Sequence, residues 1–414
     1  MPKHTRALAV LIVVYASFYL CRANVDAAQV PFCNIYGYTK AQWGAAMAWV
    51  VLGHAVGKTA MGALGDRIGG KALLSLCAIG SIGLSLGMSL VSSLTALVIL
   101  ATFNRLFQAG GWSGVVNVAS YSFPNEKRGS LMGLLSISYV AGSPIALIVC
   151  GLIVDRASWR ALFLLNPALL FGAIVLGWIM LPSSNAKSPE HAPTIEHAPE
   201  SHAPESKERY GVVLRSLFRK PAFWLALVLS AMLTFVQTCF VSWMPRYLYD
   251  VASAVGESGA ISGSLFKSAL FGGGGILGAL LAGRISDRFG PGKRAPVMAV
   301  FLGLHVVAVF ALAHVPVKSS LHAAAIVGVC GLFLQGPYTL LLGAVALDLG
   351  GKSIASTTVG LIDGVGYLAG AAAPLVIGAI AEKSGWSRAF DLIGIAGTVA
   401  TVVTILWAVR AKKD

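Results

Sequence analysis

The sequence predicts an all-α membrane protein of twelve transmembrane helices, arranged as two pseudo-symmetric six-helix bundles. Of the 414 residues, 56% are hydrophobic and only 12% are charged, a balance that no soluble domain requires. Apolar runs of about twenty residues, long enough to cross a bilayer, recur along the whole chain. A short charged sequence also occurs twice, at equivalent places in the two halves, which is typical of a fold built from a repeat.

The apolar runs form two sets of six on either side of a polar break. The expected helices are 7–29, 41–64, 72–92, 95–122, 130–154 and 160–182, then 222–249, 262–285, 296–316, 321–348, 354–381 and 388–410. They define an N-terminal bundle at 1–182, a cytoplasmic linker at 183–221 and a C-terminal bundle at 222–414. The linker is rich in proline and carries a degenerate EHAP repeat, which predicts a disordered, extended segment.

Lysine and arginine gather in alternate loops, for example at 3–6, 67–71, 127–128 and 215–220. This pattern predicts a multi-pass protein of the inner membrane with both termini in the cytoplasm. It also explains the net charge of +14 by contact with the lipid bilayer, so no nucleic-acid partner is expected. The six cysteines lack metal-ligand spacing, and no nucleophile–base pair or nucleotide-binding loop is apparent. We therefore expect no enzyme, no metal and no cofactor.

The first apolar run contains an arginine, Arg22, which shares one helix face with Tyr15, Tyr19 and Asp26. A guanidinium inside the bilayer is costly unless it faces a cavity or a partner, so it predicts a functional site. The alternative is that Arg22 pairs with Asp26 at i,i+4 and only closes the outer end of the helix. The two tyrosines on the same face favour the functional interpretation.

The repeated sequence reads GALGDRIGGK at 62–71, after the second helix, and GRISDRFGPGKR at 283–294, after the eighth. Its glycines allow a tight turn and close helix approach. Its charged residues can pair and separate as two bundles rock against each other, which predicts a conformational latch. The latch residues are Asp66, Arg67, Asp287 and Arg288.

Two further polar sets lie inside apolar runs. Asp363 in the eleventh run must pair with a cation or hold a proton. It is a proton-coupling group, a ligand for a substrate hydroxyl or amine, or the ion-pair partner of Lys58 or Lys267. Arg105 in the fourth run is interpreted as part of an internal hydrogen-bonding scaffold with Asn104 and Gln108 rather than as a substrate ligand.

The paired loops resemble those of the major facilitator superfamily, and RLFQAG at 105–110 is similar to its R-x-x-Q-x-G pattern. Within this superfamily, the chain most resembles the organophosphate:phosphate antiporter family, a family of glycerol-3-phosphate transporter-like proteins. This resemblance is carried by YLCRAN at 19–24, GK at 57–58, QAGGW at 108–112, SWMPRYL at 242–248, QGP at 335–337 and GYL at 366–368.

The resemblance implies that Arg22 binds the anionic head of a substrate with help from Lys58, Tyr15 and Tyr19. His54 stands where glycerol-phosphate members have a tyrosine, and Gln237 stands where the family has a second phosphate-binding arginine. The family's fifth-helix histidine is replaced by Ser138.

A phosphate dianion is held best by two guanidinium groups, so Gln237 predicts a site for a smaller negative charge. Otherwise the site recruits another cation, for which Lys267 is the candidate. The alternative for Lys267 is that its side chain snorkels to the outer interface.

Together these observations predict a secondary active transporter for a small organic anion, a phosphorylated metabolite or a carboxylate. Anion exchange by alternating access, with inorganic phosphate as a possible counter-substrate, is the leading expectation. The alternatives are a proton-coupled organic-acid symporter, with Asp363 or Asp26 carrying the proton, and a sugar-phosphate sensor of the same fold. We expect a monomer.

Overall fold

The computed structural model describes residues 3–122, 128–181, 215–289, 294–350 and 355–410. All regular structure in these ranges is helical. Most of the predicted linker, residues 183–214, lies outside the described residues, and residues 215–219 of it are helical. Eight helices in the described part are long and apolar enough to cross a membrane, with the two segments of the last helix counted as one.

The first half contains α1 (Lys3–Tyr36), α2 (Lys40–Ile68), α3 (Gly70–Leu90), α4 (Leu94–Ser122), α5 (Arg128–Arg156) and α6 (Leu162–Met180). The second half contains α8 (Pro221–Ala254), α9 (Ala260–Phe289), α10 (Arg294–His314), α11 (Ser320–Leu340), α12 (Ala346–Gly350) and α13 (Ala355–Arg410). A π-helical turn (Leu341–Val345) joins α11 to the short α12. Gly385, at φ 81°, breaks α13 into two helices. With α12 taken as the end of α11, the described residues form the twelve long helices that the sequence predicts.

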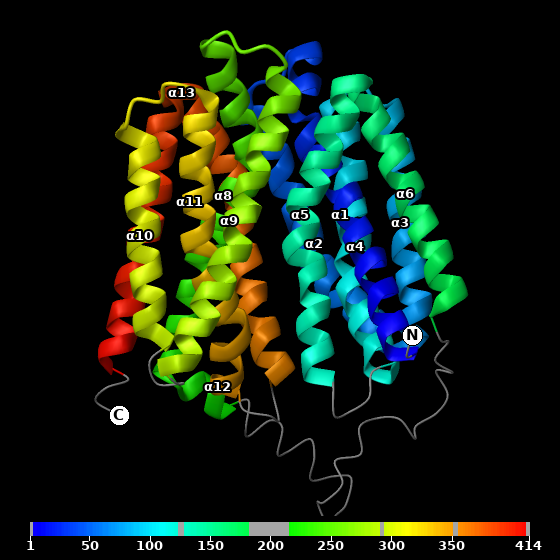
Figure 1. Cartoon of the computed structure of the whole chain (residues 1–414), viewed down its shortest axis with the longest axis vertical. Coiled ribbons are helices and arrows are strands. Elements are labelled where there is room, and N and C mark those ends of the chain that lie inside the picture. Colours follow the sequence, from blue (N-terminus) through cyan, green and yellow to red (C-terminus); the bar gives the residue numbers. More distant parts are fainter. Residues whose placement is uncertain (1–2, 123–127, 182–214, 290–293, 351–354, 411–414) are drawn as a thin grey trace, which may run out of the picture.

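The helices form two bundles that stand side by side, and the first turn of α1 and the last turn of α13 lie at the same end (Figure 1). The bundles meet where α2 packs on α13 and where α5 packs on α9. In each case the second helix of one half contacts the fifth helix of the other. This reciprocal pairing is the two-fold relation that the repeated loop sequence predicts.

Close approach of α9 and α11 depends on glycines. A Cβ atom at Gly278 would overlap the carbonyl oxygen of Leu332, and one at Gly274 would overlap that of Gly328. The GGGG sequence at 272–275 therefore lets two backbones touch, as small residues do in membrane helix pairs. One consequence for the site is that Gly275 leaves room for the side chain of Gln335.

Gly278→Ala is expected to lower the free energy of unfolding by about 1–3 kcal/mol, because α9 and α11 must separate to admit the methyl group. Gly283→Ala is the matched control, since a Cβ atom there meets nothing within 4 Å. Replacing a glycine inside a helix by alanine removes conformational freedom from the unfolded chain. The Gly283→Ala control should therefore be as stable as the wild type or up to about 1 kcal/mol more stable. Thermal unfolding of the detergent-purified variants measures both, and equal melting temperatures would disprove the tight contact.

The end of the molecule opposite the termini is held closed by contacts between the halves. At the start of α2, the Lys40 Nζ lies 2.8 Å from Asp250 Oδ2, and the Lys40 backbone nitrogen donates to Glu382 at 2.9 Å. Trp386 also donates to Asp250 at 2.9 Å. We call Lys40, Asp250, Glu382 and Trp386 the distal clasp. It joins α2 of one bundle to α8 and α13 of the other.

The loop between α8 and α9 contains a second polar cluster, centred on Glu257. Its carboxylate pairs with Lys267 at 2.7 Å and accepts hydrogen bonds from the backbone nitrogen of Ser320, at 3.0 Å, and from the Ser320 hydroxyl. The hydrogen bond from Lys267, followed by those from Ser320, lowers the pKa of Glu257 from 4.5 to about 2. The cluster ties the start of α11 to the α8–α9 loop.

Because this pKa is lower in the folded chain, the ionised Glu257 stabilises the fold above pH 4.5, and this contribution is lost as the pH falls toward 2. We expect Glu257→Gln to be less stable than wild type by under about 1 kcal/mol at pH 6, as for a partly exposed ion pair. The difference should shrink as the pH is lowered through this window. Melting curves of both proteins from pH 6 to pH 3 measure it, and a gap that stays constant would contradict the assignment.

Candidate functional site

A cavity of about 270 Å³ lies between the two bundles. Side chains from α1, α2, α4 and α5 line one side, and side chains from α8, α9, α11 and α13 line the other. The polar lining residues are Tyr19, Arg22, Asp26, His54, Arg105 and Ser143 from the first half, and Thr234, Gln237, Thr238, Ser242, Ser268, Gln335, Tyr338, Thr339 and Tyr367 from the second. The charged lining residues all come from the first half.

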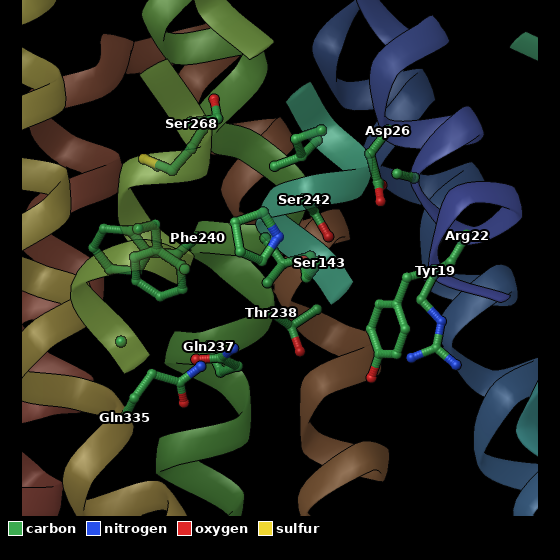
Figure 2. A pocket seen from close by; sticks show the side chains of 18 of the residues that line it. Tyr19, Arg22, Asp26, Ser143, Gln237, Thr238, Phe240, Ser242, Ser268 and Gln335 are labelled. Atoms are coloured by element: carbon green, nitrogen blue, oxygen red, sulfur yellow. The ribbon is translucent and has the colours of Figure 1, made fainter. Parts of the chain in front are cut away.

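Arg22 reaches the cavity from α1, beside Tyr19 (Figure 2). Its guanidinium lies 4.6 Å from the centre of the Tyr19 ring, and its Nε donates to the Gln108 side-chain oxygen at 3.4 Å. Both of these neighbours are neutral. Asp26 also interacts electrostatically with Arg22, but its ion pair is with Arg105. Tyr15 is buried behind Tyr19, with its ring 5.6 Å from the Tyr19 ring and 5.1 Å from that of Trp112, and it supports the site without lining it.

Arg105 also lines the cavity, from α4. Its Nη2 lies 3.4 Å from Asp26 Oδ2 and 3.3 Å from the carbonyl oxygen of Arg22. Asp26 therefore pairs with Arg105, and not in the i,i+4 arrangement with Arg22. The scaffold interpretation of Arg105 is incomplete, because this residue both positions α1 and presents charge to the cavity. The sequence feature that points to a cavity role for Arg105 is the same as for Arg22, namely a charged residue in an apolar run.

Lys58 and Asp363 form an ion pair across the two halves, and neither residue lines the cavity, although Tyr367 beside them does. The Lys58 Nζ also lies 4.2 Å from the centre of the Tyr367 ring, and the His54 ring lies 5.2 Å from the same tyrosine. His54 itself is buried, with its Nδ1 3.3 Å from the carbonyl oxygen of Arg105. The Asp363 carboxylate thus has a cation partner, one of the two arrangements the sequence left open.

The formal charge of this site is +1, with histidine neutral. The three cations Arg22, Lys58 and Arg105 face the two carboxylates Asp26 and Asp363. Two ion pairs account for four of these charges. Among the described residues of the site, the excess charge is that of Arg22.

The cavity wall of the second half is neutral. Gln237 from α8 and Gln335 from α11 lie on the side opposite Arg22 (Figure 2). Lys267 does not supply the second cation there, because it is occupied by Glu257 at the edge of the molecule and does not line the cavity. Gln335 belongs to the QGP motif at 335–337 that carries part of the family resemblance, but no role was assigned to it, since nothing in one chain shows which neutral polar residues of a helix face a cavity.

The predicted latch is only partly described. Arg67, Asp287 and Arg288 are exposed near the ends of α2 and α9, and the side chain of Asp66 lies outside the described residues. The latch remains a prediction.

Comparison with known proteins gives a consistent result. The sequence model of the Major Facilitator Superfamily matches residues 11–374 and 268–414. A glycerol-3-phosphate transporter of Bacillus subtilis is 27% identical over 92% of this chain and 87% of its own length. The glucose-6-phosphate exchanger SLC37A2 of Bos taurus is 27% identical over 74% of this chain and 67% of its own.

Among solved structures, a bacterial homologue of the human lysosomal transporter Spinster, in an inward-facing and unoccupied conformation, superposes with a TM-score of 0.79. It is 17% identical, and the match covers 99% of this chain and 98% of that one. At this identity the likeness shows the fold alone.

Proposed function

Because the chain belongs to the major facilitator superfamily, we propose that its cavity carries a small organic anion across the membrane by alternating access. The prediction of a multi-pass membrane transporter rather than an enzyme is confirmed by the family and by its transporter relatives. The relatives named for glycerol 3-phosphate and glucose 6-phosphate support an anionic substrate. The positive loops favour an inner-membrane protein with both termini in the cytoplasm.

The observation that carries this proposal is the uncompensated guanidinium of Arg22 at the cavity between the halves. A charge that must be closed off from water is costly, and a bound anion removes that cost. One negative charge brings the site to zero, so a carboxylate fits without further change. A phosphate monoester carries nearly two charges at neutral pH and needs a proton as well, for which Asp26 or Asp363 offers a place.

The same reasoning favours exchange. The empty site has a charge of +1 and resists closure, so the return step requires a second anion, with inorganic phosphate as one candidate. The competing mode is proton symport, which the two carboxylates at the site favour. In that mode Asp363 would leave Lys58 and accept a proton during the cycle.

Transport assays in proteoliposomes that contain the purified protein test anion exchange against proton symport. Labelled glycerol 3-phosphate, glucose 6-phosphate and lactate are offered outside, with the same unlabelled anion or only buffer inside. We expect uptake of at least one anion to need the internal anion. Uptake into buffer-filled vesicles that follows an imposed pH gradient would replace exchange by symport, and no uptake under either condition would contradict the anion site.

A further inference from the structure

We propose that Gln237 and Gln335 form an acceptor pair whose side-chain amides turn their buried oxygens toward the cavity when substrate binds, and that the pair recognises hydrogen-bond donors, hydroxyl or amine, on the uncharged end of the transported anion. This inference rests on the proposed function and states which part of the substrate the second half of the same site binds. That part is a neutral group that donates hydrogen bonds, and not a second negative charge. Gln237 and Gln335 are then specificity-determining residues.

The first observation is that both side-chain oxygens are buried without a hydrogen-bond partner. The Oε1 atoms of Gln237 and Gln335 are inaccessible to solvent, and no described group donates to either. Both residues line the cavity and lie on one side of it, across from Arg22 (Figure 2). A buried acceptor that lacks a donor is destabilising, and functional sites are where such groups persist.

The second observation concerns the hydroxyl groups around this pair. Thr238 donates to the carbonyl oxygen of Thr234 at 2.7 Å, and Ser268 donates to that of Ser264 at 2.7 Å. Thr339 donates to the carbonyl oxygen of Gln335 at 2.9 Å. Each hydroxyl proton is used within its own helix, so these oxygens present only lone pairs to the cavity. The wall is rich in acceptors.

An acceptor-rich wall selects against the charged end of the substrate. Carboxylate and ionised phosphate oxygens are acceptors themselves. They would meet lone pairs at the Oε1 atoms and at these hydroxyl oxygens, and the glutamine Nε2 amides would offer them only neutral donors. They are attracted instead to Arg22 on the opposite side. A substrate that spans the cavity is therefore oriented with its anionic group toward α1 and its hydroxyl or amine groups toward α8 and α11.

The backbone is built to place this pair. Gly275 in α9 has no side chain where the Gln335 methylene groups pass, and a Cβ atom there would collide with them. The tight α9–α11 contact thus directs Gln335 into the cavity. A glutamine held this way loses little conformational freedom on binding, which suits a residue that discriminates between ligands.

The test compares two pairs of probes on the full-length purified protein. Glycerol 3-phosphate is paired with propyl phosphate, and glycerate is paired with propanoate, so that each pair differs only in hydroxyl groups. Dissociation constants are measured by ligand-induced thermal shift. We expect the hydroxylated member of at least one pair to bind ten or more times more tightly, as at other sites built to hydrogen-bond a substrate hydroxyl.

The double variant Gln237→Leu/Gln335→Leu should reduce this ratio to within about twofold, because the hydroxylated probe loses more affinity than the deoxy probe. The single variants should each give an intermediate ratio, and they keep the test available if the double variant does not fold. Gln29→Leu is the matched control. Its Oε1 is also buried without a partner, yet it does not line the cavity, so the ratio should stay at the wild-type value.

The outcomes separate the two proposals. Wild-type ratios near one, or ratios that the leucine variants do not change, would overturn the acceptor pair and mean that these oxygens make no contact with the substrate. The anion site would stand in that case. If the wild type binds neither member of either pair, the anion site itself fails, and this inference fails with it.

Discussion

Arg22→Ala is expected to reduce anion uptake by about a hundredfold or more, the largest effect of any single substitution in the cavity. The guanidinium is the uncompensated charge of the site, and its removal leaves a bound anion buried without a counter-charge. Losing one partner of a buried pair costs about 3–5 kcal/mol, and each 1.4 kcal/mol is about tenfold. Arg22→Lys keeps the charge but not the planar fork, so we expect a loss of about tenfold.

Counterflow of a transported anion in proteoliposomes measures this effect, with incorporation of each variant quantified. Arg388→Ala is the control, because it also removes one positive charge, but from a side chain that is 74% exposed and remote from the cavity lining. Its uptake should match the wild type. Normal uptake by Arg22→Ala would remove the basis for the whole site.

The second large effect is expected from the Lys58–Asp363 pair, and it should be non-additive. Lys58→Ala changes the formal charge of the site from +1 to zero, and Asp363→Asn changes it to +2. We expect each single variant to lose about tenfold or more in uptake, since either leaves one charge without its partner. The double variant Lys58→Ala/Asp363→Asn restores +1 and should transport better than either single variant.

This double-mutant cycle distinguishes an effect of the net charge of the site from a direct contact between Lys58 and the substrate. Recovery in the double variant supports a role for the pair in balancing the site. A double variant that is no better than Lys58→Ala would show that Lys58 itself contacts the substrate. A proton-coupled mechanism makes a different prediction, because Asp363→Asn alone would then abolish uptake driven by a pH gradient while leaving exchange intact.

The fold was largely predictable from the sequence, because apolar length and repeated loops are local signals. The helices extend past the predicted limits at the distal end, where α1 continues from 29 to Tyr36 and α8 from 249 to Ala254. The last two predicted runs, 354–381 and 388–410, correspond to the two segments of α13 on either side of Gly385.

The site was predictable where a charge in an apolar run gave the signal. Arg22 and Asp26 line the cavity, and Lys58 and Asp363 pair beside it. His54, which also lines the cavity, was named only from the family resemblance. Two positions depend on tertiary structure that a single chain does not reveal. Arg105 was given only a scaffold role, since its direction depends on how α4 packs on α1. Gln335 was noted only as part of a resemblance motif, since its placement depends on a glycine in another helix.

The distal clasp affects the apparent affinity of the empty protein for solute on one side of the membrane. If access alternates as proposed, solute that arrives from the clasped side binds only the fraction of molecules in which Lys40 and Asp250 have separated. The apparent dissociation constant on that side is then the intrinsic one divided by this fraction. Each 1.4 kcal/mol of clasp stability weakens apparent affinity there about tenfold. One binding site therefore presents two different affinities to the two compartments, and substitutions at Lys40 would tune their ratio without touching the cavity.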